Sequence, residues 1–372
     1  MTMVGSAIST TGHQGGNQRG PEKLLIVDCD IHEGTRSQKD LYPYLPQVYR
    51  DQIEDFGISF GGLTYPSIAK GATRHDLWRD EKTHPGTDVE LVREFFDANG
   101  IDYGVLTGGP YGAVAHPDAD FCAAYCRAFN EWEVDTWISA DERFRGSIHI
   151  APQDPMLAVQ EIERLGTHPK IVQVMLPAGA RFPYGNRFYH PIWEAAETLG
   201  LVICVHPSAE GAGINSPPTA AGYCTYYPEM RAAWAQIAQA HLASLIYEGV
   251  FAKFPRLKFL FIEHDTFWVP GLLWRMDADW KGLRFRVPWV EEKPSDYVLR
   301  NVRFGSQPIP EPPNPEDLLT HLKWMHADQT MVYCSDYPHW DMDLPTKILS
   351  GVSPELKRRI FGENARELYR LL

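Results

Sequence analysis

The sequence has 372 residues, of which 44% are hydrophobic and 12% aromatic, and its formal net charge at pH 7 is −13. Such a composition can build a large apolar core, but the negative charge argues against a nucleic-acid partner, because phosphate binding relies on clustered Lys and Arg and no such run is present. Since there is no secretory signal or apolar run of membrane-spanning length, and the six cysteines are scattered, we expect a cytoplasmic protein with reduced thiols and no membrane partner.

The first predicted elements are a tail, a strand and a long insertion. Residues 1–20 are rich in Gly, Ser, Thr, Gln and Asn and are predicted to be a disordered tail. The apolar run 24–34 turns polar at alternate positions and stops at a glycine, which is typical of a strand. Residues 35–97 are predicted to form an ordered insertion with a helix near 45–55. At its end, residues 88–99 read as an amphipathic helix that Gly100 terminates.

Strands and helices then alternate to the end of the chain. Short apolar runs predicted as strands are 101–107, 145–151, 171–176, 201–206, 256–264, 297–304 and 330–335. Helices are predicted between them at 118–138, 154–166, 191–199, 228–253 and 271–283. Strands that are apolar on both faces are what a parallel sheet covered by helices requires. We therefore predict the α/β class and one (β/α)8 barrel over residues 21–372, with a long insertion between its first strand and first helix.

Polar side chains stand at the carboxyl ends of several predicted strands. In the first strand, Asp28, Asp30 and His32 alternate with apolar residues and therefore share one face. The fifth, sixth and eighth strands end in His206, His264 and Asp336. In a barrel these ends converge on one mouth, where residues distant in sequence become neighbours. The pattern favours a shared site, with a solvated strand end and hydrogen-bonded structural histidines as the alternative.

The chemistry of these residues suits a divalent metal ion. Two carboxylates and two imidazoles, without thiolates, make a mixed oxygen and nitrogen site that suits Zn²⁺ and Mn²⁺ about equally. Such an ion polarises a carbonyl group that binds to it. It also polarises a phenol and a carboxylate of one substrate when both bind to the ion at the same time. A metal-free barrel that binds a ligand or scaffolds a partner is the alternative of a different class. Other polar residues are predicted to be structural or to lie outside the site: His149, Asn186, His190 and His241.

Six segments of the chain resemble the amidohydrolase superfamily. They are VDCDIH, RFRGSIHIAPQDPMLAVQEIERL, VICVHPS, FLFIEHDTFWVPGLLWRMD, VYCSDYPHWD and IFGENARELYRLL. Within the superfamily, they are similar to the subgroup of aminocarboxymuconate-semialdehyde decarboxylase and related aromatic acid decarboxylases. The resemblance spans about residues 24–372 and implies a (β/α)8 barrel with a metal ion at its mouth. Members of this family often dimerise, so a homodimer is possible.

The resemblance also implies a role for each strand-end residue. A single divalent metal ion, Zn²⁺ or Mn²⁺, is expected to be held by Asp30, His32, His206 and Asp336. His264 is expected to activate a bound water or to contact the substrate. Arg275 matches, more loosely, an arginine that binds substrate carboxylates, and a surface salt bridge is the alternative for it.

The first strand departs from the family pattern. Where relatives usually have His or Glu, this chain has Asp30, which is one methylene shorter than Glu, so either the ion lies closer to the first strand or Asp30 reaches it through water. Glu33 is expected to support the site without binding the metal, because it points to the opposite face if the strand continues. Residues 171–176 contain no lysine of the kind that carries the bridging carbamate in binuclear relatives. One metal ion is therefore the simpler interpretation.

Two reactions use the same residues. In the one that the resemblance favours, decarboxylation, Asp336 or a water activated by His264 delivers a proton to a carbon of an aromatic or unsaturated acid, and CO₂ leaves. In the other, an activated water attacks an ester, lactone, amide or ketone carbon while Asp336 takes and returns the proton. Several aromatic residues either suit a planar substrate or belong to the core: Phe56, Phe60, Tyr65, Phe267, Trp268 and Trp274.

Overall fold

Parallel strands form the centre of the protein. In the computed structural model, which describes residues 23–58, 72–80 and 83–371, eight strands follow the chain order, and each pairs in parallel with the next. Their bounds are Val27–Ile31 (β1), Tyr103–Leu106 (β2), Phe144–His149 (β3), Ile171–Pro177 (β4), Val202–His206 (β5), Lys258–Phe261 (β6), Val302–Gly305 (β7) and Met331–Val332 (β8). Backbone bonds from Cys29 N to Tyr333 O (2.9 Å) and from His32 N to Tyr337 O (2.8 Å) join the first strand to the last. The predicted (β/α)8 barrel is confirmed.

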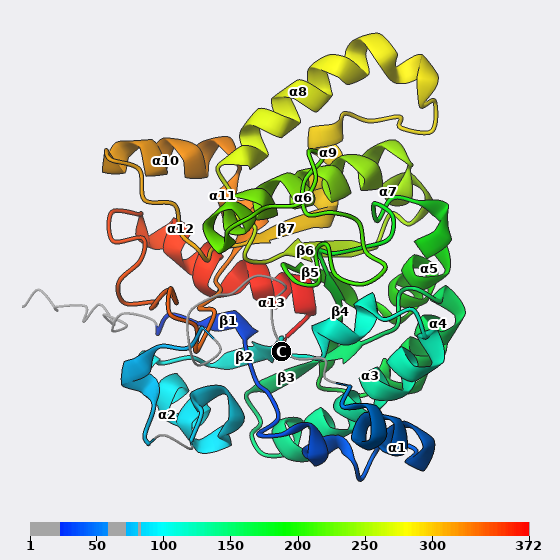
Figure 1. Cartoon of the computed structure of the whole chain (residues 1–372). Coiled ribbons are helices and arrows are strands. Elements are labelled where there is room, and N and C mark those ends of the chain that lie inside the picture. The colour runs from blue at the N-terminus through cyan, green and yellow to red at the C-terminus, as the bar shows by residue number, and fades with distance from the viewer. Residues whose placement is uncertain (1–22, 59–71, 81–82, 372) are drawn as a thin grey trace, which may run out of the picture.

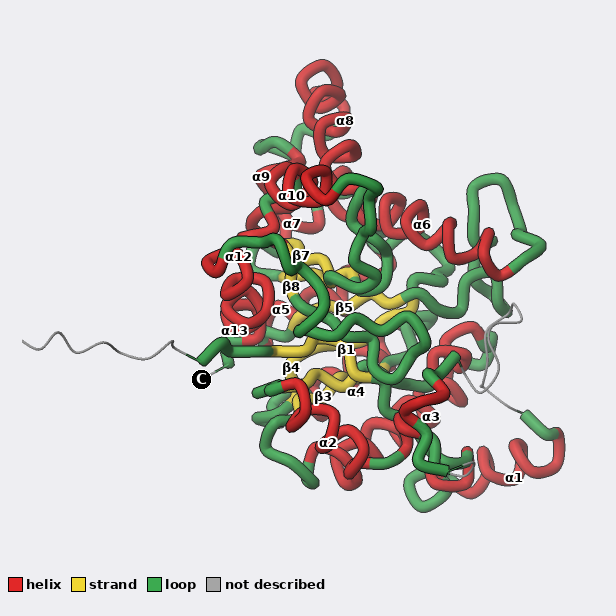
Figure 2. Tube along the Cα trace, turned by 90° about the vertical axis from the view of Figure 1, so that its left-hand side faces the viewer, coloured by secondary structure: helices red, strands yellow, loops and turns green. Residues whose placement is uncertain are grey.

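Helices surround the strands, as Figures 1 and 2 show from two directions. Their bounds are Gln47–Phe56 (α1), Val89–Asn99 (α2), Ala119–Glu133 (α3), Pro155–Leu165 (α4), His190–Leu199 (α5), Tyr227–Tyr247 (α6), Val250–Lys253 (α7), Trp268–Leu283 (α8), Pro294–Asn301 (α9), Pro315–Trp324 (α10), Ala327–Thr330 (α11), Pro354–Arg358 (α12) and Asn364–Tyr369 (α13). In both views α8 projects beyond the ring of helices. The strands therefore lie inside, and their carboxyl ends are available to build a site.

Helix α2 illustrates how the sequence determines an element. The Asp88 side chain accepts hydrogen bonds from the backbone N–H groups of Glu90 and Leu91, which caps the first turn. Apolar residues at helical spacing, among them Val92 and Phe96, are buried against the barrel. Gly100 ends the helix with a φ of 68°, a left-handed conformation that glycine adopts without steric cost. The helix predicted at 88–99 is confirmed.

Two predicted elements differ from the structure. The expected strand 297–304 is wrong in its first part, because α9 extends to Asn301 and β7 contains only the residues after it. Pro294 stands in the first turn of α9, where its missing N–H is harmless, and Tyr297 and Val298 bury one face of the helix. The expected helix 228–253 is two helices, α6 and α7, because Gly249 between them has a φ of 78°.

Parts of the predicted insertion and tail cannot be compared with the structure. The tail predicted at 1–20 lies outside the described residues, and so do Phe60 and Tyr65 of the insertion. The helix predicted near 45–55 is present as α1. Among the helices that the structure describes, none combines the length and the apolar character needed to cross a membrane.

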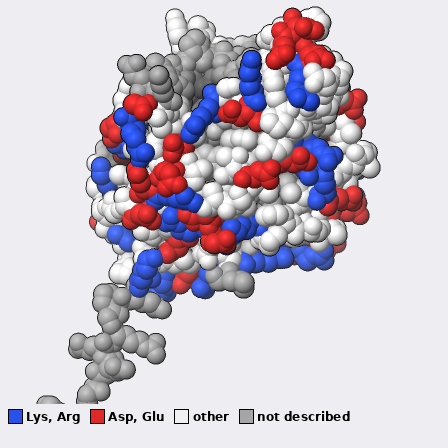
Figure 3. Space-filling view, turned by 90° about the horizontal axis from the view of Figure 1, so that it is seen from below, with Lys and Arg blue, Asp and Glu red and all other residues white. Residues whose placement is uncertain are grey.

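Charged side chains of both signs are interspersed on the surface. Figure 3 looks onto the side of the molecule that lies lowest in Figure 1, and there basic and acidic residues alternate. Ion pairs of this kind include Arg93 with Asp141 (3.2 Å) and Arg143 with Asp97 (2.7 Å), which connect α2 to the segment before β3. Ion pairs that solvent can reach, as these two are in part, add little to the free energy of unfolding. The apolar core, rather than surface charge, therefore holds this side together.

Candidate metal centre and cavity

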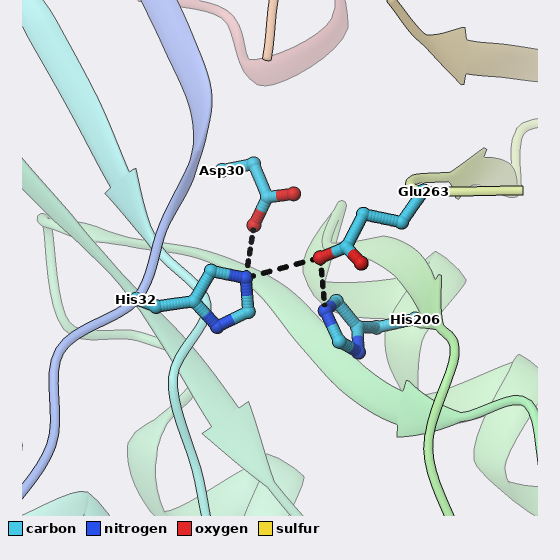
Figure 4. Close-up of side chains that lie close together, drawn as sticks. All are labelled: Asp30, His32, His206 and Glu263. Atoms are coloured by element: carbon cyan, nitrogen blue, oxygen red, sulfur yellow. Dashed lines mark hydrogen bonds and ion pairs between the residues drawn. The ribbon is translucent and has the colours of Figure 1, made fainter. Parts of the chain in front are cut away.

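Five acidic and histidine side chains meet at the carboxyl ends of the strands. Asp30 lies in β1 and His32 just after it, His206 ends β5, and Glu263 and Asp336 follow β6 and β8. His32 Nε2 is 3.1 Å from Asp336 Oδ1 and 3.2 Å from both Asp30 Oδ1 and Glu263 Oε1. Glu263 Oε1 is also 2.7 Å from His206 Nε2. Figure 4 shows four of these side chains pointing toward one another, and we call all five the mouth cluster.

The mouth cluster contains more acceptors than donors. A ring nitrogen carries at most one proton, yet His32 Nε2 faces three carboxylate oxygens, and His206 Nε2 shares one of them. Asp30 Oδ2 is buried and has no hydrogen-bond partner among the described residues. Buried negative charge without partners is costly, and a cation compensates for it. Asp30, His32, His206 and Glu263 each place one donor atom within 4.8 Å of the others, so they fit a single divalent ion.

The charges of the mouth cluster shift the pKa values of its members. Burial opposes the charged form of His32, but Asp30, Asp336 and Glu263 outweigh burial and hold the pKa of His32 well above its ordinary value. Burial also opposes ionisation of Glu263, yet His206 and His32 hold its pKa well below the ordinary value. Burial and the charge of Glu263 raise the pKa of Asp336 to about 6. A carboxyl group with this pKa can hold and release a proton close to neutral pH.

Neighbouring residues orient the carboxylates. Thr107 Oγ1 donates a hydrogen bond of 2.6 Å to Asp30 Oδ1. His339 Nδ1 pairs with Asp336 Oδ1, and the His339 ring lies 4.2 Å from the ring of His32, centroid to centroid. His339 was not selected from the sequence, although it stands in the same VYCSDYPHWD segment as Asp336. It belongs to a second set of close donors with His32, Glu263 and Asp336.

The structure corrects the expected position of His264. This residue is buried, but it does not line the cavity. Strand β6 ends at Phe261, and Glu263 has a φ of 58°, so the alternation of the strand does not continue to His264. Glu263 reaches the mouth cluster instead. Sequence reasoning missed it, and the only signal was a carboxylate within a buried apolar run.

Arg275 is also not where the sequence suggested. It lies on α8 with 75% of its side chain exposed and pairs with Asp279, one helical turn away. The surface salt bridge, the alternative interpretation, is the arrangement found. Two arginines line the cavity: Arg36, which is exposed and pairs with Asp88, and Arg231 of α6, which pairs with Asp341 and stacks on Trp234 and Trp340.

A cavity of about 580 Å³ opens onto the mouth cluster. Its walls include His32, Glu263 and Asp336, and its aromatic residues are Tyr111, Tyr227, Trp234 and Trp340. The Tyr111 ring is stacked on His206 at a centroid distance of 4.9 Å. The aromatic residues predicted to suit a substrate do not contribute, as far as the structure describes them: Phe56, Phe267, Trp268 and Trp274 are absent from these walls. The cavity is nevertheless lined by both aromatic and charged residues.

Comparison with known proteins gives the family. A family model described as Amidohydrolase matches residues 27–371. The chain belongs to this family. A relative from Polaromonas sp., a gamma-resorcylate decarboxylase, is 25% identical over 300 residues, which are 74% of this amidohydrolase and 85% of the relative.

Solved structures share the fold of this amidohydrolase. An amidohydrolase from Mycobacterium avium subsp. paratuberculosis has a TM-score of 0.70 at 17% identity, covering 94% of this chain and all of the other. The 5-carboxyvanillate decarboxylase of Novosphingobium aromaticivorans, solved with manganese and 4-hydroxy-3-methoxy-5-nitrobenzoic acid, has a TM-score of 0.68 at 20% identity, covering 95% of this chain and 98% of the other. One barrel fold therefore spans these proteins.

Gly108 makes a close backbone approach beside the mouth cluster. Its N–H donates a 3.0 Å hydrogen bond to Glu33 Oε2, and a Cβ on Gly108 would lie 1.7 Å from the backbone oxygen of Glu33. We expect Gly108→Ala to lower the free energy of unfolding of this amidohydrolase by about 3 kcal/mol, because the added Cβ would overlap the backbone oxygen of Glu33. Urea denaturation measures the change. Gly351→Ala is the matched control: a Cβ there meets nothing within 4 Å, so a comparable loss in the control would contradict the steric cause.

Proposed function

We propose that this amidohydrolase is a metal-dependent, non-oxidative decarboxylase of an aromatic or unsaturated carboxylic acid. The observation that carries the proposal is the mouth cluster, in which side chains from β1, β5, β6 and β8 converge on one point beside a cavity with aromatic walls. The gamma-resorcylate and 5-carboxyvanillate decarboxylases similar to this chain support the choice of reaction.

A single divalent ion is the proposed cofactor, held by the mouth cluster. Asp30, His32, His206 and Asp336 are the ligands expected from the sequence, and Glu263 joins them because its Oε1 lies between the two imidazoles. When bound, the ion acts as a Lewis acid that neutralises the charge of a phenolate and a carboxylate. Mn²⁺ and Zn²⁺ both suit this set of ligands, and the manganese in the 5-carboxyvanillate decarboxylase structure makes Mn²⁺ the first ion to try.

The residues of the chain then perform three tasks. Asp336 holds the proton that is added to the carbon bearing the carboxylate, and His339, paired with Asp336 Oδ1, keeps the carboxyl group oriented. As the new C–H bond forms, the bond to the carboxylate breaks and CO₂ leaves with no net oxidation. The aromatic walls bind the planar ring and exclude water. Asp336 is then reprotonated from solvent for the next turnover.

The direct test is an assay for CO₂. Purified enzyme loaded with Mn²⁺ is incubated with a panel of hydroxybenzoates, and CO₂ release is followed together with loss of the aromatic acid. Parallel reactions contain aryl esters and lactones. Hydrolysis of these without CO₂ release would contradict decarboxylation and favour the hydrolase alternative. A protein that neither binds Mn²⁺ or Zn²⁺ nor turns over any of these compounds would favour the metal-free binding barrel.

Arg231 is the proposed binding residue for the substrate carboxylate, in the role that the sequence had suggested for Arg275. The guanidinium lies at the cavity, and its pKa remains above the ordinary value although burial lowers it, because Asp341 and Tyr227 stabilise its charge. We expect Arg231→Gln to raise KM about 10- to 100-fold with a smaller change in kcat, since one charge-assisted hydrogen bond is lost. Steady-state kinetics with the best hydroxybenzoate measure this. Arg275→Gln, on the outer surface, is the control and should leave KM within about twofold.

The homodimer and the cytoplasmic location stay predictions. Helix α8 exposes Trp274 and Leu283, and Trp324 of α10 packs edge-to-face against Trp274 at a centroid distance of 5.4 Å. An exposed apolar surface of this kind supports association with a second subunit.

A further inference from the structure

A second group of potential metal ligands lies outside the mouth cluster. It consists of Glu33 after β1, Glu133 at the end of α3 and His149 at the end of β3, and we call it the inner triad. One donor atom of each residue lies within 4.8 Å of the others. The three side chains are buried, with relative exposures of 4%, 0% and 3%. None of them was predicted from the sequence to bind a metal.

Each member of the inner triad is held by a backbone group and leaves one polar atom without a partner. Glu33 Oε2 accepts a hydrogen bond from Gly108 N at 3.0 Å, and Glu133 Oε1 accepts one from Ser147 N at 3.3 Å. The His149 ring forms a hydrogen bond with the backbone of Gly108. The second atoms, Glu33 Oε1, Glu133 Oε2 and His149 Nε2, are buried and have no partner among the described residues. Three buried polar atoms without partners in one place are what a bound cation would satisfy, in exchange for the protons that the carboxyl groups otherwise hold.

The surroundings hold the His149 ring in one position. Asn130 brackets its backbone, since Asn130 Oδ1 accepts from His149 N at 2.8 Å and Asn130 Nδ2 donates to His149 O at 2.9 Å. Phe129 packs edge-on against the ring at a centroid distance of 5.0 Å. Gly109 leaves room for the ring, because a Cβ there would lie 2.0 Å from His149 Cε1. A ligand fixed by its neighbours in this way loses little entropy when it binds an ion.

No basic side chain neutralises the two carboxyl groups of the inner triad, and burial raises the pKa of Glu33 to about 8 and that of Glu133 well above its ordinary value. Neither Glu33 nor Glu133 forms an ion pair with Lys or Arg within the ranges that the structure describes. Burial lowers the pKa of His149 to about 3, so its imidazole is neutral at pH 7 and does not supply a positive charge. A neutral imidazole is, however, the form that binds a metal ion.

We propose that Glu33, Glu133 and His149 bind a second divalent cation, separate from the ion at the mouth cluster. Two carboxylates and one imidazole without thiolates suit Mn²⁺, Fe²⁺ or Zn²⁺. The ion can enter from the cavity, because Glu33, Gly108 and Gly109 line it. The inner triad lies beside β1 and β3 and takes no ligand from β4. The bridging lysine of binuclear relatives is expected on β4, so its absence from this chain does not affect the inner triad. This inference is independent of the proposed decarboxylation, since it concerns binding alone.

Metal counting on the whole protein tests the inner triad. Protein stripped with a chelator is dialysed to equilibrium against Mn²⁺ in chelator-treated buffer, and bound manganese is measured by mass spectrometry. We expect two ions per chain in the wild type, one in Glu133→Gln, and two in Glu131→Gln, which changes a half-buried neighbour on the same helix that pairs with Arg127 and Arg164. Two ions in Glu133→Gln, or one ion in both the wild type and Glu133→Gln, would overturn the proposal; the triad would then share protons instead of holding a metal.

A variant of the mouth cluster separates the two sites. We expect His206→Asn to retain one ion per chain, bound at the inner triad, and to show a higher melting temperature when Mn²⁺ is added. No bound ion in a folded His206→Asn protein would overturn the inference even if Glu133→Gln failed to fold. If the wild type and His206→Asn each bind one ion while Glu133→Gln binds none, the inner site stands and the proposed mouth centre fails.

Discussion

Asp336→Asn is expected to reduce decarboxylation by about 1000-fold or more while leaving the barrel folded. The substitution removes the proton carrier, since an amide cannot donate a proton in place of a carboxylic acid, and general acid catalysis contributes about 10²- to 10⁴-fold. It also removes a proposed metal ligand 3.1 Å from His32 Nε2. Single-turnover measurement of CO₂ release with saturating Mn²⁺ separates the lost proton transfer from weaker metal binding.

Asp279→Asn provides the control for this experiment. Asp279 undergoes the same chemical change but lies on α8, where it pairs with Arg275 away from the cavity. Its variant should keep activity within about twofold of the wild type. Circular dichroism and thermal unfolding establish that both variants are folded. Near-normal turnover by Asp336→Asn would contradict the assignment of Asp336 as proton donor.

Glu263→Gln is expected to weaken metal binding by about 100-fold or more. Glu263 Oε1 lies 2.7 Å from His206 Nε2 and 3.2 Å from His32 Nε2, so the substitution removes the negative charge of the one carboxylate that, among the described residues, contacts both imidazoles. Loss of residues that merely orient ligands already costs about 10- to 100-fold in metal affinity. Calorimetric titration of the chelator-treated protein with Mn²⁺ gives the affinity directly, and activity without added metal should fall in parallel.

The neighbouring residue discriminates between the two possible interpretations of this segment. His264 is buried outside the cavity walls, so His264→Asn should leave the affinity for Mn²⁺ at the mouth within about threefold, although it lowers stability if packing is disturbed. If His264→Asn lost the ion and Glu263→Gln retained it, the strand would continue through His264 as the sequence suggested. The role of Glu263 would then be refuted.

The barrel and most of the mouth cluster could be predicted from the sequence for a simple geometrical reason. Alternating apolar strands and amphipathic helices specify parallel strands covered by helices, and the carboxyl ends of such strands meet. His32, His206 and Asp336 follow from that rule alone, and they lie together in the structure. To apply this rule, one needs to know only the residue at which each strand ends.

The misplaced residues are those whose positions depend on local backbone geometry or on a distant segment. Glu263 takes the place expected for His264 because a positive φ at Glu263 interrupts the strand pattern, and the residue type gives no sign of this. Arg231 reaches the cavity from α6, on an excursion after β5 whose path sequence periodicity does not reveal. Arg275 matches in sequence the arginine that binds substrate carboxylates in the family, but its side chain is exposed on the outer surface.

The most direct measurement is a crystal structure of the protein soaked in Mn²⁺, with anomalous diffraction recorded at the manganese absorption edge. We predict an anomalous peak within about 2.0–2.3 Å of the nitrogen atoms of His32 and His206, with oxygens of Asp30, Glu263 and Asp336 as the remaining ligands. A map without a peak among these side chains, in crystals whose soaked manganese is visible elsewhere, would contradict a metal centre at the mouth of the barrel.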